Sequence, residues 1–195
     1  MRKQPRQARS QATIGVILQA AAHILGARGW RGLTTNSVAE AAGVSIGSLY
    51  QYFPNKLALV EAVRQRHFDE VLAILRTAAD DKIPRARRIA ALVDGMIGVH
   101  ARYPAAHRVL LEEVPRGDDV KPGHDRFAAL LQQRYEAIVA ANTRGVSGES
   151  ARMAAHVLAS AVAGVVHDAA SRGILQSASL RQELVDLVDS YLSVK

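Results

Sequence analysis

Apolar residues recur at the three- and four-residue spacing of an α-helix along most of this 195-residue chain. The first helix is expected to begin at Gln11 and to end near Gly26 and Gly29, and its apolar face consists of Ile14, Ile17, Leu18, Ala21, Ile24 and Leu25. No strand-like alternation, fixed-period repeat or low-complexity tract interrupts this pattern. The sequence therefore predicts an all-α fold.

Capping and helix-breaking residues set the expected boundaries of the other helices. Thr34 or Thr35 can cap a short helix that Gly43 ends, and Pro54 stops the short helix that follows it. Ser179 begins a capping-box pattern for the last helix of the chain. Helices are expected over residues 36–42, 44–53, 55–77, 84–100, 104–111, 124–141, 149–172 and 180–192.

Charge is spread unevenly along this chain, whose net charge is +7. Residues 1–64 hold eight Lys or Arg against two Glu, whereas residues 65–195 hold seventeen Lys or Arg against sixteen Asp or Glu. A basic end on a nearly neutral body suggests that this end meets a polyanion, either nucleic acid or an anionic membrane. A solvated basic tail without a partner would give the same pattern.

Composition excludes several other classes of protein. The chain has no cysteine, which excludes disulfides and thiol catalysis and fits a cytoplasmic location. No apolar signal core follows the N-terminus. The longest stretch near the C-terminus without Asp, Glu, Lys or Arg covers only residues 153–167, whereas a membrane span needs roughly 20 apolar residues. We expect a buried helix of a soluble protein there, and no membrane partner.

The two short helices around Gly43 are typical of a helix-turn-helix, whose second helix enters the major groove of DNA. Leu49 and Phe53 are four residues apart and can face the core. The residues then left to face the bases are small or polar, except for one that can contact a thymine methyl group. These candidate base-contacting residues are Ser45, Ile46, Gly47, Ser48 and Gln51.

A second set of residues has the chemistry of phosphate contacts. Thr35, Tyr50 and Tyr52 supply hydroxyl groups, and Lys56 supplies an ammonium group beside the first turn of the fourth helix. That turn adds free backbone N–H groups and the positive end of the helix dipole. The alternative is a helical hairpin whose two tyrosines only pack, because generic helix-turn-helix spacing is not specific.

A longer series of residues, in order and without a gap, resembles the N-terminal signature of the TetR (tetracycline-repressor) family of bacterial regulators. The matching residues are Thr34-Thr35, Val38-Ala39, Ala42-Gly43-Val44-Ser45, Gly47-Ser48-Leu49-Tyr50, Tyr52-Phe53 and Lys56-Leu57. The resemblance covers about residues 11–60. It implies the DNA-contacting roles given above at the same positions.

The resemblance also implies an organisation and a function. Residues 11–57 would be a three-helix DNA-binding domain with a helix-turn-helix, and residues 58–195 a helical domain for ligand binding and dimerisation. The basic and polar residues 1–10 before them are themselves expected to form a flexible arm. The protein would be a ligand-responsive repressor, a homodimer through its last two helices. It would leave a palindromic, double-stranded DNA operator when a small-molecule effector binds.

The effector site has no family-wide motif, and its candidates come from the polar and aromatic residues of the C-terminal two thirds. They are His100, Tyr103, His107, Phe127 and His167. Ordinary polar residues at a helix junction and histidines of the core or an interface are the alternatives. Aromatic residues are few in this part of the chain, which favours an aliphatic or a neutral-to-anionic effector.

Two apolar segments could hold a dimer together. Residues 154–166 are rich in Ala, Gly and Val, which let helices approach closely, and the last helix carries a leucine-rich stripe. Packing within one subunit is the alternative. A small helical enzyme using the His and Glu residues near 100–113, and an architectural DNA-binding protein without an effector, are the competing functions. The sequence predicts no catalytic residue, metal site or cofactor.

Overall fold

The computed structural model describes residues 4–114, 121–143 and 145–194, and within these ranges the chain forms α-helices and no strand. The all-α expectation is confirmed. The chain divides into two compact units. Of the described residues, the N-terminal unit comprises 4–66 and 103–114, and the C-terminal unit comprises 67–102, 121–143 and 145–194.

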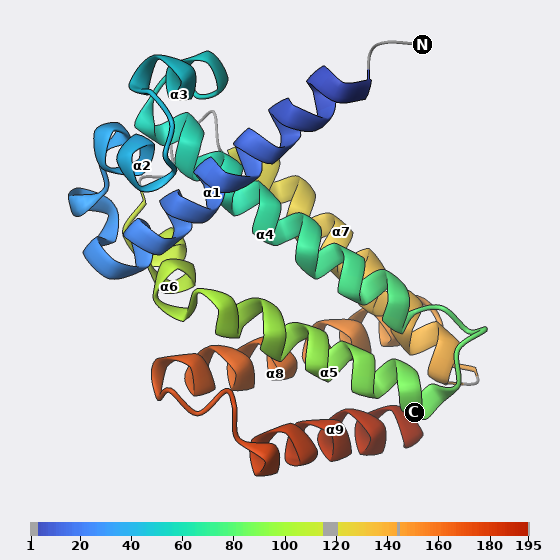
Figure 1. Cartoon of the computed structure of the whole chain (residues 1–195). Coiled ribbons are helices and arrows are strands. Elements are labelled where there is room, and N and C mark those ends of the chain that lie inside the picture. The colour runs from blue at the N-terminus through green and yellow to red at the C-terminus, as the bar shows by residue number, and fades with distance from the viewer. Residues whose placement is uncertain (1–3, 115–120, 144, 195) are drawn as a thin grey trace. The chain divides into compact units, whose positions relative to one another are not determined.

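The N-terminal unit contains the first three helices, the beginning of the fourth, and the sixth (Figure 1). These are α1 (Gln4–Gly32), α2 (Thr35–Ala41), α3 (Ile46–Tyr52), α4 (Lys56–Ala78) and α6 (Pro104–Glu112). Helix α1 packs against both α2 and α6, and α2 packs against α3. The shared core includes fully buried Ile17, Leu25, Leu33, Val38, Leu49 and Leu59.

Two boundaries differ from the sequence-based expectation. Residues 4–10, which were expected to lie in a flexible arm, belong to α1, and residues 1–3 of that arm lie outside the described residues. Residues 103–114 belong to the N-terminal unit, although the sequence places everything beyond residue 57 in the second domain. The cause is the apolar face of α6 and the residues after it: Ala106, Val109, Leu110 and Val114 are buried in the same core as α1.

Capping hydrogen bonds fix where several helices begin. The Thr34 hydroxyl accepts a hydrogen bond from Ser37 N and forms a capping box with that residue. Asn55 Oδ1 accepts from Ala58 N at 2.8 Å in the first turn of α4. The capping box expected at Ser179 is wrong: Ser177 caps the last helix, and its hydroxyl accepts from Leu180 N.

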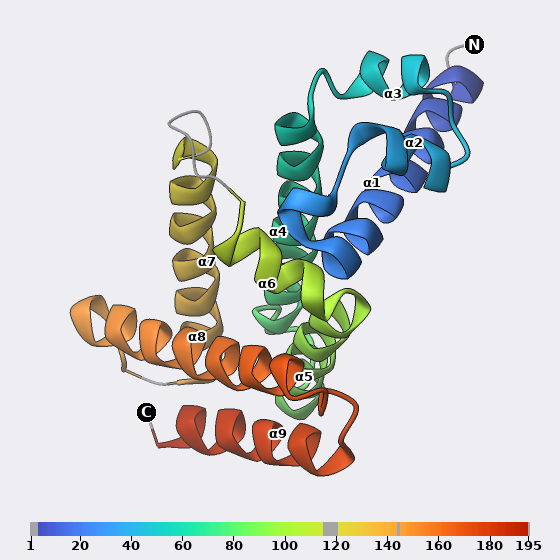
Figure 2. The ribbon, with the colours of Figure 1, turned by 90° about the vertical axis from the view of Figure 1, so that its left-hand side faces the viewer.

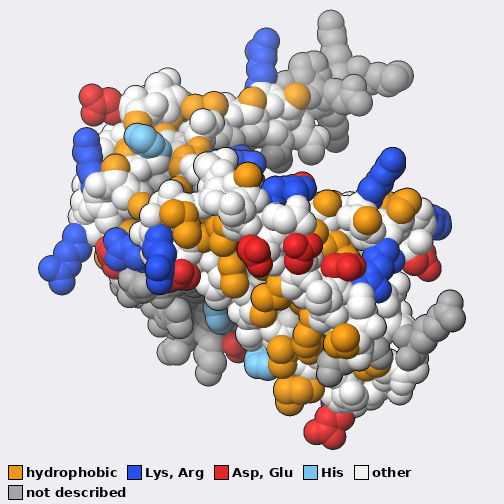
Figure 3. Space-filling view, turned by 90° about the horizontal axis from the view of Figure 1, so that it is seen from below, with side chains coloured by type: hydrophobic (Ala, Val, Ile, Leu, Met, Phe, Trp, Pro, Cys, Tyr) orange, Lys and Arg blue, Asp and Glu red, His pale blue; other side chains and the backbone are white. Residues whose placement is uncertain are grey.

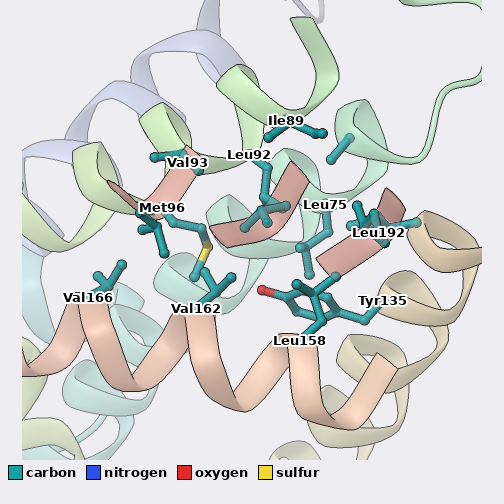
Figure 4. Packing of buried hydrophobic residues seen from close by; sticks show 14 of the residues in the cluster. Leu75, Ile89, Leu92, Val93, Met96, Tyr135, Leu158, Val162, Val166 and Leu192 are labelled. Atoms are coloured by element: carbon teal, nitrogen blue, oxygen red, sulfur yellow. The ribbon is translucent and has the colours of Figure 1, made fainter. Parts of the chain in front are cut away.

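The C-terminal unit holds the rest of α4 and the remaining helices, α5 (Arg85–Arg102), α7 (Lys121–Asn142), α8 (Gly148–Ser171) and α9 (Ala178–Ser193). Figure 4 shows how residues of α4, α5, α7, α8 and α9 meet in its core. Helices α8 and α9 lie side by side and run in opposite directions (Figure 2).

Residues 7–32 and 148–171 form helices long and apolar enough, by length and composition, to cross a membrane. Both helices place apolar residues inside their own unit. Ile17 and Leu25 of the first and Val162 and Val166 of the second are fully buried. Core packing therefore accounts for part of their apolar composition, since 39% and 33% of the two apolar windows are buried.

Candidate functional site

Helix α3 buries one side and leaves the other open to solvent. Leu49 is fully buried, and Phe53 directly after the helix is also buried. Among the candidate base-contacting residues, Ser45, Ile46, Gly47 and Gln51 are exposed and Ser48 is half-buried. The structure therefore brings these five residues together on the accessible part of one short helix and its cap.

The turn before α3 depends on a glycine and two serines. Gly43 has φ +66°, a left-handed conformation that residues with a side chain rarely adopt. Ser45 caps α3, since its hydroxyl accepts from Ser48 N at 3.0 Å and lies 2.8 Å from the Ser48 hydroxyl. The first turn of the helix is thus held in one conformation before any ligand binds.

The candidate phosphate-contacting hydroxyl groups are held by neighbouring helices. Thr35 Oγ1 of α2 and the Tyr50 hydroxyl of α3 are 3.1 Å apart. Ser10 of α1 donates a hydrogen bond to the Tyr52 hydroxyl at 3.3 Å. Tyr50 remains 48% exposed, so its phenol is accessible as well as oriented.

Lys56, the fourth candidate phosphate contact, begins α4 and reaches back to the end of α1. Its Nζ donates to the Trp30 carbonyl at 2.5 Å and lies 4.1 Å from the centre of the Trp30 ring. Partial burial lowers the pKa of Lys56. The sequence did not single out Trp30, although Gly29 before it marked the end of the helix.

Three histidines meet in the C-terminal unit. The His100 ring of α5 lies 5.2 Å from the His67 ring of α4 and 5.1 Å from the His167 ring of α8, measured between ring centres. His100 is almost completely buried, and its Nδ1 lies 2.8 Å from the Met96 carbonyl oxygen. Burial, with the neighbouring imidazoles, lowers the pKa of both His67 and His100 to about 4. Burial also lowers the pKa of His167.

An aromatic pair lies beside these histidines. Phe68, next to His67 in α4, stacks on Phe127 of α7 with ring centres 3.7 Å apart and an angle of 4° between the planes. The His124 ring lies 6.2 Å from the Phe68 ring. We call the group of His67, Phe68, His100, Phe127 and His167 the effector cluster, after the sequence-based expectation that His100, Phe127 and His167 contact an effector.

The effector cluster contains three of the five residues that the sequence suggested: His100, Phe127 and His167. Tyr103 belongs to the N-terminal unit, where it packs against that unit's core. The side chain of His107 lies outside the described residues. Sequence reasoning missed His67 and Phe68, because nothing in the local pattern of α4 shows which helices it faces. Within the described ranges, no group of three or more His, Cys, Asp or Glu residues could hold a metal ion.

An open groove of about 760 Å³ lies between α8 and α9. Its lining is mainly apolar, with Val157, Ala161 and Val165 from α8 and Leu187 from α9, among others. Val157 and Leu187 are each more than 40% exposed. Figure 3 views the side on which α9 lies in Figure 1, and it shows apolar side chains with acidic ones among them.

Comparisons with known proteins cover both units. Residues 17–63 match the family described as bacterial regulatory proteins of the tetR family. The transcriptional activator FasR of Mycolicibacterium smegmatis is 32% identical over 98 residues, which is 50% of this chain and 45% of FasR. The regulator RutR of Escherichia coli is 36% identical over 101 residues, which is 52% of this chain and 47% of RutR. These matches therefore span about half of this chain and less than half of each relative.

Solved structures resemble almost the whole chain. The fatty acid degradation regulator FadR of Bacillus halodurans has a TM-score of 0.70 at 18% identity, and the match covers 91% of this chain and 96% of FadR. The SmeT–triclosan complex has a TM-score of 0.68 at 22% identity and covers 94% of this chain and 91% of SmeT. At these identities the likeness shows the fold alone.

The second family match covers more than half of the chain. Residues 84–192 match the tetracyclin repressor-like C-terminal domain. With the N-terminal match, both units are assigned to a family of transcriptional regulators and not of enzymes. The chain therefore belongs to the TetR family of bacterial transcriptional regulators.

Proposed function

We propose that this chain is a repressor that binds a palindromic DNA operator as a homodimer and leaves it when a small molecule binds the C-terminal unit. The exposed, small and polar surface of α3 carries the proposal. Ser45, Gly47, Ser48 and Gln51 permit close approach to base edges, and Gln51 suits adenine. Ile46 offers an apolar contact to a thymine methyl group.

In this proposal the DNA backbone is held by the hydroxyl groups of Thr35, Tyr50 and Tyr52 and by Lys56. Two contacts between side chains support it: Thr35 and Tyr50 lie within hydrogen-bond distance of each other, and so do Ser10 and Tyr52. Such contacts position a protein on the duplex but carry no sequence information. A protein that meets the chromosome in this way acts in the cytoplasm.

The dimer is proposed to form through α8 and α9. A recognition helix of seven residues reads only a few base pairs, whereas a two-fold dimer presents two such helices to successive major grooves roughly 34 Å apart. The groove between α8 and α9 exposes apolar side chains that a second copy of this chain would cover. The small residues of α8 allow that close approach.

The effector is proposed to bind at the effector cluster. Phe68 and Phe127 offer an aromatic surface, and the three imidazoles place polar groups beside it in a largely buried setting. The SmeT neighbour is described as a complex with triclosan, so one protein of this fold binds that molecule. By analogy, we expect an effector with an apolar body and few polar groups.

Selection of bound duplexes from a random-sequence DNA library tests the base-reading face. The wild-type protein should select a palindrome with two half-sites. Gln51→Ala and Ser48→Ala should each relax the preference at one or two positions of each half-site, weakening binding to the best site by about 1–3 kcal/mol.

Gln133→Ala, which changes an exposed glutamine of α7 in the C-terminal unit, is the matched control and should preserve the selected sequence. Unchanged selectivity in both α3 variants would show that the recognition face is wrongly assigned. A reporter gene behind the selected site then separates repression from activation.

A further inference from the structure

Helix α1 is kinked near its C-terminal end, where an unusual backbone conformation lies against the end of α6. Gly29 has φ +68° and ψ −178°, which lies in a region that residues with a side chain rarely adopt. A Cβ atom at this position would lie 2.8 Å from Oε2 of Glu113, directly after α6. Gly29 therefore supplies both the conformation and the space that bring the Glu113 carboxylate to the backbone of α1.

The Glu113 carboxylate uses this approach to bind the next residue. Trp30 N donates a hydrogen bond to Glu113 Oε2 at 3.1 Å, between residues 83 positions apart in the sequence. Hydrogen bonds to an ionised carboxylate are stronger than those between neutral groups. Arg108 on α6 lies 3.7 Å from the other carboxylate oxygen.

Trp30 in turn contacts Lys56 in two ways. The Trp30 carbonyl accepts one hydrogen bond from Lys56 Nζ, and the indole ring lies 4.1 Å below the same atom. An ammonium group has three N–H donors, so the bond to Trp30 leaves two for another acceptor. Glu113, Trp30 and Lys56 thus form one connected series inside the N-terminal unit.

We propose that Glu113 is a positioning residue for DNA binding, because it holds Trp30 in the place where Trp30 fixes the Lys56 ammonium group for a DNA phosphate. This inference rests on the proposed phosphate contact of Lys56. A lysine side chain loses rotamer freedom when it binds, and a lysine already held by a carbonyl and a ring has lost much of it beforehand.

Two substitutions with the same charge change test the role of the hydrogen bond. Glu113→Ala removes the acceptor, whereas Glu113→Gln keeps an amide oxygen that can accept from Trp30 N. The probe is a fluorescent 30-base-pair duplex of random sequence at low salt, because phosphate contacts act on any sequence. We expect Glu113→Ala to weaken binding by about three- to tenfold and Glu113→Gln to bind at least as tightly as the wild type.

The direction of the change separates this role from bulk electrostatics. Loss of one negative charge alone would strengthen binding to a polyanion in both variants alike. Equal or tighter binding by Glu113→Ala, relative to Glu113→Gln, would therefore overturn the proposal.

A double-mutant cycle with Lys56→Ala shows whether Glu113 acts through Lys56. In the Lys56→Ala background, Glu113→Ala should cause no further loss of affinity. Additive losses would mean that Glu113 acts by another route. Unchanged binding by Lys56→Ala alone would show that Lys56 does not contact a phosphate, and this inference would then be wrong. DNA binding by the wild type would still support the proposed function.

Trp30→Leu provides a second route if Glu113→Ala fails to fold, as judged by circular dichroism. It keeps both backbone hydrogen bonds and removes only the ring beside Lys56. We expect about two- to fivefold weaker binding to the same duplex, and again no further loss in the Lys56→Ala background. Wild-type affinity of Trp30→Leu in a folded protein would contradict the positioning role of Trp30.

Discussion

The two units differ in how their polar groups are hydrogen-bonded. In the N-terminal unit the candidate DNA-contacting hydroxyl groups lie at the surface and are held by other side chains, as Thr35 and Tyr50 are. In the C-terminal unit several polar atoms are buried without a hydrogen-bond partner among the described residues. They are Arg88 Nε, Arg88 Nη1, Arg134 Nε, the Tyr135 hydroxyl and Asn142 Oδ1. No such atom of the N-terminal unit is found within the described ranges.

This difference matches the ligands proposed above for each unit, DNA for the N-terminal unit and a small molecule for the C-terminal unit. A surface that reads DNA gains affinity when its groups are oriented beforehand, and hydrogen bonds among them provide that orientation. Buried polar groups without partners lower stability, and in native proteins they call for an explanation such as a ligand or an ordered water. The C-terminal unit is therefore the part of the chain in which we expect occupancy to change stability most.

The largest effect should come from breaking the dimer through the C-terminal unit while sparing the N-terminal one. Ala161→Glu places a carboxylate in the groove between α8 and α9, where a second copy would bury it unpaired. We expect a loss of about 3–5 kcal/mol in dimerisation free energy, measured by light scattering against protein concentration. Operator affinity should fall with it, and helical circular dichroism should remain.

Ser160→Glu is the matched control for this variant. It adds the same charge to an exposed neighbouring position of α8 that does not line the groove. It should therefore dimerise like the wild type. An intact dimer in Ala161→Glu, or a wild-type protein that binds its operator as a monomer, would refute the assignment of α8 and α9 to the interface.

The second-largest effect is a loss of folding stability at low pH, which arises from histidines of the C-terminal unit. The pKa values of His67 and His100 are lowered to about 4 in the folded protein, against about 6.5 in an unfolded chain. As the pH falls from about 6.5 to 4, the unfolded chain takes up protons that the folded C-terminal unit does not. The free energy of unfolding therefore falls in that pH range, by about 3 kcal/mol at most for each histidine. Above about pH 6.5 the two histidines do not change it.

Urea unfolding at pH 7.5 and pH 5, followed in the wild type and in His100→Gln, measures this loss. The variant should lose less stability than the wild type between the two pH values, because it lacks one of the two imidazoles whose pKa is lowered to about 4. Other titratable groups near the cluster, namely His124, His167 and the Glu70–Arg102 ion pair, are present in both proteins. An equal pH dependence in the two proteins would show that His100 is not a source of the effect.

Sequence reasoning worked best where a feature is local. The exposed face of α3 follows from the spacing of Leu49 and Phe53 within one helix, and the glycine at position 43 marks the turn before it. Sequence reasoning failed where two nearby residues could equally well cap the same helix. Ser177 and Ser179 both lie near the start of the last helix, and only the fold determines that the chain at Ser177 takes the extended conformation of a cap.

It also failed where distant segments meet. The approach of His67 to His100 and His167 depends on how α4, α5 and α8 pack, which no single periodicity encodes. For the same reason the sequence does not show that residues 103–114 pack with the N-terminal unit, since an apolar helix face does not reveal which helix it contacts. The roles of the DNA-contacting and effector-cluster residues stay predictions.

The smallest expected effect is a change in the free energy of unfolding when each of two tyrosines is replaced by phenylalanine. The change should have opposite signs at the two positions, which tests whether the C-terminal unit contains unsatisfied polar groups. Tyr135 is 1% exposed, and its hydroxyl finds no hydrogen-bond partner among the described residues. Figure 4 shows its place in the core of the C-terminal unit. Burial also raises the pKa of Tyr135, so the phenol stays neutral. Tyr135→Phe should therefore stabilise the unliganded protein by about 1 kcal/mol.

The Tyr191 hydroxyl, in contrast, donates to the Ala154 carbonyl at 3.3 Å, so Tyr191→Phe should destabilise the protein by about 0.5–1 kcal/mol. Urea midpoints at constant slope measure both changes. Equal destabilisation by the two substitutions would mean that Tyr135 has a partner in solution, such as an ordered water, and that the contrast between the two units is smaller than the described side chains indicate.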